Sequence, residues 1–336
     1  MTLTLLKMSH ICKSYPGVQA VDDVSIDLYA GEVLGLMGEN GAGKSTLIKM
    51  LAGAEKIDSG EIYIEEKKVD INSPKASQDH GVSVIHQELI TMDTLSVAEN
   101  IFVGQLPVKK ATKLIDWKAA RKKSAEALAL LHSEINPKSI VSSLSIYEKQ
   151  IVEVAKAIHK NAKVVVMDEP TAALSEKDSK ALFTVIKSLK KQGVGIIYIS
   201  HRIEEVFQIS DRITVMRDGE FIGTKPTKGT DQKEIISMMI GRELNQFFPE
   251  IRSEKKGVMM KVSDLNINGI IENISFEVKK GEILGLFGLV GSGCLNIARA
   301  LIGADDIDQG EFHINGKKTS IKNPKNALKN KIGFIP

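Results

Sequence analysis

The stretch GENGAGKS, Gly38–Ser45, matches the pattern G-x-x-x-x-G-K-[ST] at every fixed position. Its glycines let the backbone approach a phosphate closely, and successive N–H groups at the start of the following helix form an anion site. Lys44 would bring a positive charge to the β- and γ-phosphate oxygens, and Ser45 would offer its hydroxyl to Mg²⁺. The predicted nucleotide-binding residues are Gly38, Glu39, Asn40, Gly41, Ala42, Gly43, Lys44, Ser45 and Thr46.

A second chemical element is the acidic stretch VVVMDE, Val164–Glu169. Its four apolar residues place Asp168 at the C-terminal tip of a buried strand, and such tips line the ligand crevice of open α/β sheets. We predict that Asp168 holds Mg²⁺ through water and that Glu169 polarises the attacking water. An acidic pair alone could merely end a strand at the surface, but beside a phosphate loop it indicates a hydrolytic site.

The segments around these two motifs alternate between strand and helix. Val33–Met37, Val164–Met167 and Ile196–Ile199 are continuous apolar runs, which suit buried parallel strands. Leu47–Ala52 continues as a helix after the loop, and Lys177–Lys190 has helical spacing. This alternation predicts an α/β layered sheet.

Other segments have a simpler pattern. Residues 3–8, 24–29 and 61–65 alternate or carry β-branched residues, as strands do. Asp116–Leu131 places apolar residues on or near one face of a helix. We therefore expect further strands before and after the loop, and a helix in the middle of the chain.

The chain contains an internal repeat. Residues 31–86 and 281–336 align without a gap, and about 22 of the 56 aligned pairs are identical. GEVLGLMGENGAG (Gly31–Gly43) matches GEILGLFGLVGSG (Gly281–Gly293), and IDSGEIYI matches IDQGEFHI. An ungapped alignment of this length and identity is not expected by chance, so we infer a duplicated domain.

The second copy has no counterpart of the residues that follow His86 in the first. A sheet cut there would leave strand edges uncovered, so we expect the chain to be a fragment of a protein of about 500 residues. We assign residues 1–245 to the first domain and residues 258–336 to a partial second domain. Residues 246–257, with a proline and clustered charges, are the expected linker.

Composition excludes several classes of protein. The 336 residues are 43% hydrophobic and 26% charged, as in ordinary globular proteins. No apolar run approaches the ~20 residues of a membrane-spanning helix. The net charge of +3 is too balanced to indicate a nucleic-acid partner. The two cysteines, Cys12 and Cys294, lie far apart, which suits a reduced cytoplasmic location.

The order of motifs resembles the nucleotide-binding subunits of ATP-binding-cassette (ABC) transporters. Tyr15 precedes GENGAGKS, Gln87 lies in VIHQE, LSIYEKQ and VVVMDEPT follow, and His201 lies in YISHR. The chain is most similar to the double-cassette ATPases of ribose, galactoside and xylose importers. Three features carry this likeness: the duplication, the degenerate second loop, and the stretches EVAKAI, DEPTAALSEKD and YISHRIEEV. The resemblance implies ATP and Mg²⁺ as cofactors. It also implies a P-loop NTPase cassette with an antiparallel β subdomain and a helical subdomain at about 88–160, duplicated, with the second copy incomplete.

The resemblance assigns roles to three further residues. Tyr15 matches the aromatic residue that stacks on adenine, for which its flat face is suited; a core aromatic beside Pro16 is the alternative. Gln87 matches the glutamine that reaches Mg²⁺ and the attacking water and senses the membrane partner. His201 matches the switch histidine at the γ-phosphate. Together with Lys44 and Glu169, we expect Gln87 and His201 to be catalytic.

Two places depart from the family pattern. The signature LSGGQ is replaced by LSIYE, Leu144–Glu148, so that a tyrosine obstructs the approach of a phosphate and Glu148 repels it. In the second loop, Cys294 and Leu295 stand where the first loop has Lys44 and Ser45. Cassettes of this family pack head to tail, so both defects would fall in one composite site. We therefore expect one working site and one degenerate site in the complete protein.

The function implied by the resemblance is ATP-driven uptake of a monosaccharide. The chain would lie at the cytoplasmic face of the membrane as a peripheral subunit, beside integral permease subunits and, indirectly, a periplasmic or extracellular sugar-binding protein. A soluble tandem cassette that acts on ribosomes or DNA is the alternative, although its members usually have a long charged linker and two intact loops. A third possibility is that this polypeptide alone is only a nucleotide-binding module.

Overall fold

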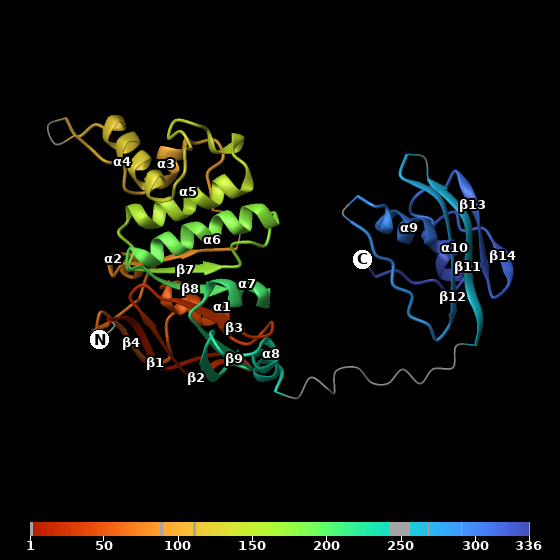
Figure 1. The fold of residues 1–336 in the computed structure, drawn as a ribbon, viewed down its shortest axis with the longest axis horizontal. Coiled ribbons are helices and arrows are strands. Elements are labelled where there is room, and N and C mark those ends of the chain that lie inside the picture. The colour runs from red at the N-terminus through yellow and green to blue at the C-terminus, as the bar shows by residue number, and fades with distance from the viewer. Residues whose placement is uncertain are drawn as a thin grey trace. The chain divides into compact units, whose positions relative to one another are not determined.

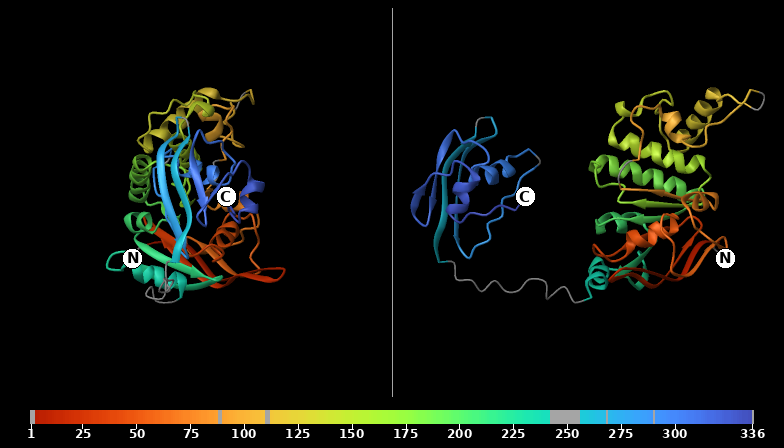
Figure 2. Two further views of the ribbon diagram at one scale, coloured as in Figure 1. Left: turned by 90° about the vertical axis from the view of Figure 1, so that its right-hand side faces the viewer. Right: turned by 180° about the vertical axis from the view of Figure 1, so that it is seen from behind.

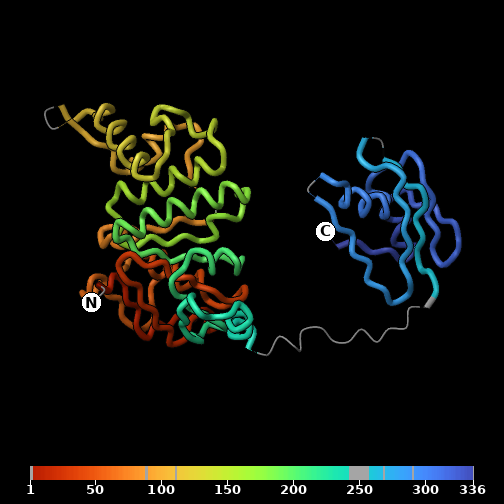
Figure 3. Tube along the Cα trace, in the orientation of Figure 1, coloured from red at the N-terminus to blue at the C-terminus, as the bar shows by residue number. Residues whose placement is uncertain are grey.

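The computed structural model describes residues 3–87, 90–109, 112–241, 256–267, 269–289 and 291–335. The chain divides into two compact units, unit 1 (Met1–Phe247) and unit 2 (Phe248–Pro336) (Figures 1 and 3). Of the linker predicted at 246–257, residues 246–255 lie outside the described residues. Residues 256 and 257 already belong to the first strand of unit 2.

Unit 1 is built on one sheet that is antiparallel in one half and parallel in the other. Neighbouring strands from β9 to β6 run parallel, whereas β1, β2, β4 and β5 pair antiparallel. The predicted α/β cassette with an antiparallel subdomain is therefore confirmed. In sheet order, the described strands are β5 (Lys67–Val69), β4 (Ser59–Ile64), β1 (Thr4–Tyr15), β2 (Val18–Tyr29), β10 (Glu220–Pro226), β9 (Arg212–Arg217), β3 (Val33–Met37), β8 (Gly195–Ile199), β7 (Val164–Asp168) and β6 (Val82–Ile85).

Helices cover this sheet and form a separate helical subdomain. The views of Figures 1 and 2 agree that α3 and α4 lie beyond α5, on the side away from the sheet. The described α-helices of unit 1 are α1 (Lys44–Leu51), α2 (Pro74–Asp79), α3 (Val97–Ile101), α4 (Trp117–Leu130), α5 (Ile146–His159), α6 (Glu176–Lys191), α7 (Ile203–Ile209) and α8 (Gln232–Ile240).

The parallel strands are buried on both faces. Along β3, Val33 and Met37 enter a core shared with α5 and α6, whereas Leu34 and Leu36 enter a second core shared with α1 and the antiparallel strands. Side chains alternate between the faces of a strand, so a strand with two covered faces must be apolar throughout. All five residues of β3 are buried accordingly, which explains the continuous apolar run seen in the sequence.

Two of the longer helices of unit 1 begin directly after a capping side chain. Asp116 precedes α4 and accepts a hydrogen bond from the Ala119 N–H at 3.0 Å. Ser175 precedes α6 and accepts from the Asp178 N–H at 3.2 Å. These side chains satisfy N–H groups that have no partner within the helix. Both helices agree with the sequence prediction to within a residue or two.

Unit 2 repeats the antiparallel part of unit 1. Its described strands form a four-stranded antiparallel sheet in the order β12-β11-β13-β14. The helix α9 follows the second glycine loop, and its Ile297 and Ala300 enter the core of this unit. The elements of unit 2 are β11 (Lys256–Ile267), β12 (Ile271–Lys280), α9 (Cys294–Leu301), β13 (Gln309–Ile314), β14 (Lys317–Thr319) and α10 (Pro324–Lys329).

The two units differ at the repeat of β3. Residues 282–289 contain no strand, and the side chains of Ile283 and Phe287 are 90% and 98% exposed. In unit 1, β3 lies between β8 and β9, which follow the repeated region in sequence. The described residues of unit 2 include no repeat of those strands, and residues 282–289 pair with no strand among them.

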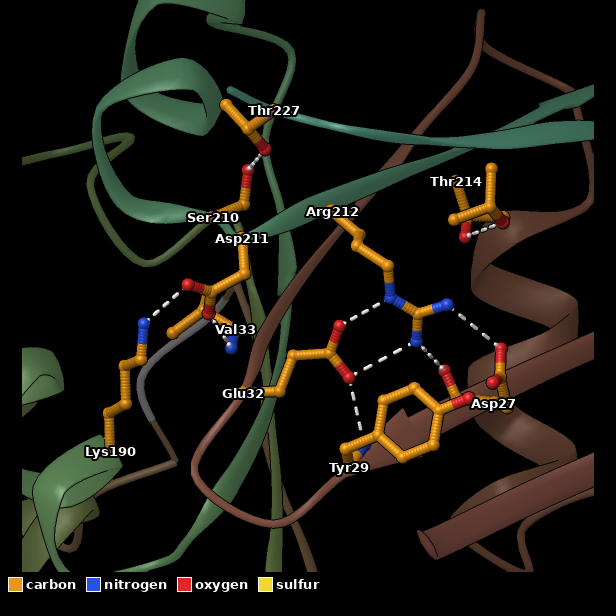
Figure 4. Close-up of polar contacts among 11 residues, drawn as sticks. Asp27, Tyr29, Glu32, Val33, Lys190, Ser210, Asp211, Arg212, Thr214 and Thr227 are labelled. Atoms are coloured by element: carbon orange, nitrogen blue, oxygen red, sulfur yellow. Dashed lines mark hydrogen bonds and ion pairs between the residues drawn. The ribbon is translucent and has the colours of Figure 1, made fainter. Parts of the chain in front are cut away.

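A polar network joins the strands of unit 1 at the N-terminal end of β3 (Figure 4). The Arg212 guanidinium donates to both carboxylate oxygens of Glu32 at 2.5 and 3.1 Å and to Asp27 at 3.2 Å. The same guanidinium lies 4.8 Å from the centroid of the Tyr29 ring. Glu32 also accepts from the Tyr29 N–H at 2.8 Å. The network therefore ties β9 to β2 and β3.

This network generates a prediction for stability. Glu32 is buried and Arg212 retains 24% side-chain exposure. The substitution Arg212→Met should lower the free energy of unfolding by roughly 3 kcal/mol, because it leaves a buried carboxylate without its counter-charge. Adding Glu32→Gln should recover part of that loss, since the amide needs no counter-charge. Urea unfolding measures the free energy of unfolding of both variants. If the double variant lost as much stability as Arg212→Met alone, or the sum of the two single losses, the proposed coupling between Glu32 and Arg212 would be contradicted.

Candidate nucleotide site

The loop between β3 and α1 requires glycine at defined places. A Cβ atom on Gly38 would lie 2.3 Å from the Met216 carbonyl oxygen, and one on Gly43 would lie 2.5 Å from the Ala20 carbonyl oxygen. Gly43 has a φ of +91°, a backbone conformation that residues other than glycine rarely adopt. The loop thus passes close to the ends of β2 and β9 and leaves its backbone exposed on the other side.

Lys44 folds back over this loop. Its Nζ donates to the carbonyl oxygens of Gly38 at 2.7 Å and Glu39 at 3.0 Å. Burial lowers the pKa of Lys44, and the nearby carboxylates of Asp168 and Glu169 oppose that shift. No side chain caps the start of α1, so its first N–H groups point to the same space. A lysine charge and the start of a helix therefore lie side by side at this loop, a combination that suits an anion.

The other predicted residues come from the ends of neighbouring strands. Asp168 is the last residue of β7, Gln87 follows β6, and His201 follows β8. Because these strands are parallel to β3, their carboxyl ends meet at the edge where the loop begins. The arrangement brings residues far apart in sequence to one side of the sheet.

A cavity of about 570 Å³ lies between the loop and these strand ends. It is lined by part of the glycine loop together with Gln87, Asp168 and Glu169. It also includes Asp218 and the start of β2, which no motif indicated. Gly38, Glu39, Ala42, Tyr15 and His201 do not line it. Its lining residues are Val18, Gln19, Ala20, Asn40, Gly41, Gly43, Lys44, Ser45, Thr46, Gln87, Asp168, Glu169, Ile199 and Asp218.

The acidic pair is electrostatically and conformationally unusual. Burial raises the pKa of Asp168, Glu169 raises it further, and His86 and Lys44 oppose the shift. Glu169 has a φ of +46°, in the left-handed region that non-glycine residues rarely adopt. Its Oε1 lies 3.1 Å from Nδ1 of His201. The structure thus places these two predicted catalytic side chains in direct contact.

Tyr15 lies at the turn between β1 and β2 and is 38% exposed, so it is not a core aromatic residue. It pairs across the hairpin with Val18, which lines the cavity. Lys13 lies 5.6 Å from the centroid of its ring. Asp58 accepts from Lys13 at 2.9 Å and from the Ser14 N–H at 2.7 Å, which anchors the end of the hairpin. A flat aromatic face is therefore held near the cavity.

The donor set at the cavity suits Mg²⁺. Ser45, Gln87 and Asp168 all line it and offer a hydroxyl, an amide oxygen and a carboxylate. Among the described residues, no group of three or more His, Cys, Asp and Glu side chains forms a metal cluster. Mg²⁺ usually takes only one or two carboxylates and completes its shell with water and substrate phosphates. The residues present fit a metal that arrives with a nucleotide.

In the divergent signature LSIYE, the hydrogen-bond donors at the start of α5 are taken up by the segment's own side chains. Ser145 is the N-cap of α5, and its Oγ accepts from the Glu148 N–H at 3.3 Å. The Glu148 carboxylate in turn accepts from the Ser145 N–H at 2.8 Å and the Ser145 hydroxyl at 2.9 Å. This capping box places a carboxylate where an incoming phosphate would need the same donors. Tyr147 instead packs partly buried against the first core.

The second loop lacks more than its lysine and serine. Cys294 begins α9, and its Sγ lies 3.4 Å from the Ser292 Oγ. The carbonyls of Cys12 and Asn266 accept the same hydrogen bond from the repeated I-D-x-G stretch, which makes them equivalent. However, β1 continues past Cys12 to Tyr15, whereas β11 ends directly after Asn266. Within the described part of unit 2, the aromatic turn therefore has no counterpart.

Comparison with solved structures supports the fold. An ATP-binding cassette of an ABC transporter, solved in its ADP conformation, is 27% identical with a TM-score of 0.63. The alignment covers 72% of this chain and all of that one. A nucleotide-free cassette from an ABC transporter is 26% identical with a TM-score of 0.62, covering 71% of this chain and 96% of its own.

Curated relatives match almost the whole chain. It is 43% identical to the ribose import ATP-binding protein RbsA of Clostridium tetani and 42% identical to the galactose/methyl galactoside import ATP-binding protein MglA 1 of Photobacterium profundum. The alignments cover 98% and 100% of this chain, which spans 65% and 67% of those relatives' lengths. A family model described as "ABC transporter" matches residues 21–172 and 271–336. The chain therefore belongs to the ABC transporter family.

Proposed function

We propose that the chain is the ATP-binding part of an importer that couples ATP hydrolysis to uptake of a monosaccharide. The observation that carries the proposal is the single cavity shared by the glycine loop, Lys44, Ser45, Gln87 and the Asp168–Glu169 pair. A nucleotide triphosphate is the ligand that needs all of these groups at once. The sugar class rests on the relatives, whose names specify import of ribose or of galactose and methyl galactoside.

The loop and Lys44 would bind the phosphates. The backbone N–H groups of the loop and the start of α1 offer donors to the β- and γ-phosphate oxygens, and Lys44 supplies a matching charge. Tyr15 would stack on adenine at the mouth of the cavity. Ser45, Gln87 and, through water, Asp168 would hold Mg²⁺, whose charge offsets that of the phosphates when it is bound.

Glu169 and His201 would act at the γ-phosphate. Glu169 faces the cavity at the tip of β7, where its carboxylate can orient and polarise a water molecule. His201 contacts that carboxylate and can donate a hydrogen bond to the terminal phosphate. Both side chains belong to short turns after buried strands, so their positions are set by the sheet.

The two defects are consistent with one working site. The donors of the first signature are taken up by its own Glu148. The second loop has Cys294 and Leu295 in place of the lysine and the serine, and no aromatic turn among the described residues of unit 2. We infer that unit 1 holds the working nucleotide loop and that unit 2 holds a degenerate one.

The partners follow from the same proposal. Among the described residues, no helix has the length and apolarity needed to cross a bilayer. The import functions in the relatives' names imply separate permease subunits that carry the sugar, with an external sugar-binding protein acting through them. The chain would be a peripheral subunit on the cytoplasmic face of the membrane. The import functions in the relatives' names argue against a ribosome or DNA partner.

Loss of the lysine charge tests ATP binding. The substitution Lys44→Ala should weaken ATP affinity by roughly 10- to 100-fold, because a charge-assisted hydrogen bond is worth ~1.5–3 kcal/mol. Lys49→Ala, an exposed site on the same helix, should leave the affinity unchanged. Titration with a fluorescent ATP analogue and Mg²⁺ measures both. Equal affinities for the Lys44 variant and the unmodified chain would contradict the proposed site.

Sugar uptake tests the transport function. Cells whose own gene carries Lys44→Ala should lose uptake of at least one of radiolabelled ribose, galactose or xylose, because no ATP energy would reach the permease. The Lys49→Ala strain should take up that sugar normally. Undiminished uptake of all three sugars by the Lys44→Ala strain would argue against monosaccharide import.

A further inference from the structure

A buried carboxylate lies behind the proposed catalytic pair. Glu205, on α7, is 9% exposed and accepts hydrogen bonds from several side chains. Its Oε2 accepts from the hydroxyls of Thr171 at 2.6 Å, Tyr198 at 3.0 Å and Ser200 at 3.2 Å. Its Oε1 accepts from Arg202 at 3.1 Å. A buried carboxylate is costly unless it is satisfied in this way, so its position is well defined.

These donors flank both catalytic candidates. Thr171 lies two residues after Glu169, and Ser200 and Arg202 lie on either side of His201. The Ser200 hydroxyl also accepts from the Arg202 N–H at 3.0 Å, which closes the turn around the histidine. Thr171 and Ser200 are themselves buried, at 1% and 4% exposure. One carboxylate therefore holds two turns that come from different strands.

The turn at Glu169 needs such support. The left-handed backbone conformation of Glu169, a non-glycine residue, is strained and persists only where the surroundings impose it. The Glu169 N–H donates to the Ile199 carbonyl at 2.9 Å, and its carbonyl accepts from the Ala172 N–H at 3.1 Å. The bond from Thr171 to Glu205 continues this anchoring toward α7.

We propose that Glu205 is a positioning residue that fixes the Glu169–His201 pair against the γ-phosphate of bound ATP. The inference rests on the proposed function, since it assumes a triphosphate in the cavity. Glu205 itself does not line the cavity and would act only through the Thr171 and Ser200 turns. Its removal should therefore affect recognition of the terminal phosphate more than binding of the rest of the nucleotide.

The experiment compares ATP with ADP on the full chain. Equilibrium affinities for both nucleotides with Mg²⁺ are measured for the unmodified chain, Glu205→Ala, His201→Ala and the double variant. Glu205→Gln is the conservative variant, and Glu204→Ala is the matched control, because Glu204 is exposed on the same helix. Thr171→Val removes one of the anchoring bonds with little change of volume and serves if Glu205→Ala does not fold. Thermal unfolding of each variant gives a separate reading of stability.

The expected result is a loss confined to ATP. Glu205→Ala and His201→Ala should each weaken ATP affinity about tenfold, the equivalent of one lost hydrogen bond to a charged group, and leave ADP affinity within about twofold. The double variant should lose little more than either single variant, because both act on one interaction. Glu205→Gln should retain much of the ATP affinity. Thr171→Val should lower the affinity for ATP and leave the affinity for ADP nearly unchanged.

Other results would overturn the inference. Equal losses for ATP and ADP in the Glu205 or Thr171 variant would assign Glu205 a purely structural role. If the losses of ATP affinity in Glu205→Ala and His201→Ala added fully in the double variant, Glu205 would not act through His201 on the γ-phosphate. An unchanged ATP affinity in His201→Ala would have the same meaning. If the unmodified chain bound neither nucleotide, the proposed function itself would fail, which is distinguishable from both of these results.

Discussion

The burial of β3 on both faces is the constraint on which the site depends. Its alternate side chains fill two different cores, so the strand cannot slide or rotate without emptying both. The chain must leave the sheet at Gly38, where no Cβ atom fits against β9. The glycine loop, the start of α1 and Lys44 follow from that exit point. The neighbouring parallel strands, held by the same cores, bring Asp168, Gln87 and His201 to the same edge.

The repeated segment in unit 2 shows what this constraint contributes. GEILGLFG keeps the apolar pattern of β3, yet it forms no strand in the described residues, and Phe287 is almost fully exposed. The helix α9 and the antiparallel sheet still form, because their contacts lie within unit 2. Among the described residues, the acidic strand tip and the proposed switch histidine occur only in unit 1, where β3 has its strand neighbours.

Much of unit 1 could be predicted from the sequence because its signals are local. The apolar runs of β3, β7 and β8 and the helical spacing of α4 and α6 correspond to the observed elements. Residues of the glycine loop line one cavity with Asp168, Glu169 and Gln87, and their roles there are proposals. The contact between Glu169 and His201 joins residues that only the sheet brings together. Asp218 and the anchoring by Glu205 could not be predicted, since a lone acidic residue in a turn or helix has no pattern that distinguishes it.

We propose that the chain has one functional phosphate site, in unit 1, and that the second loop lacks the groups that bind phosphate tightly. Calorimetric titration of the full chain with ATP and Mg²⁺ counts the nucleotides bound. One ATP should bind per chain. No measurable binding, or two sites of equal affinity per chain, would refute the proposal.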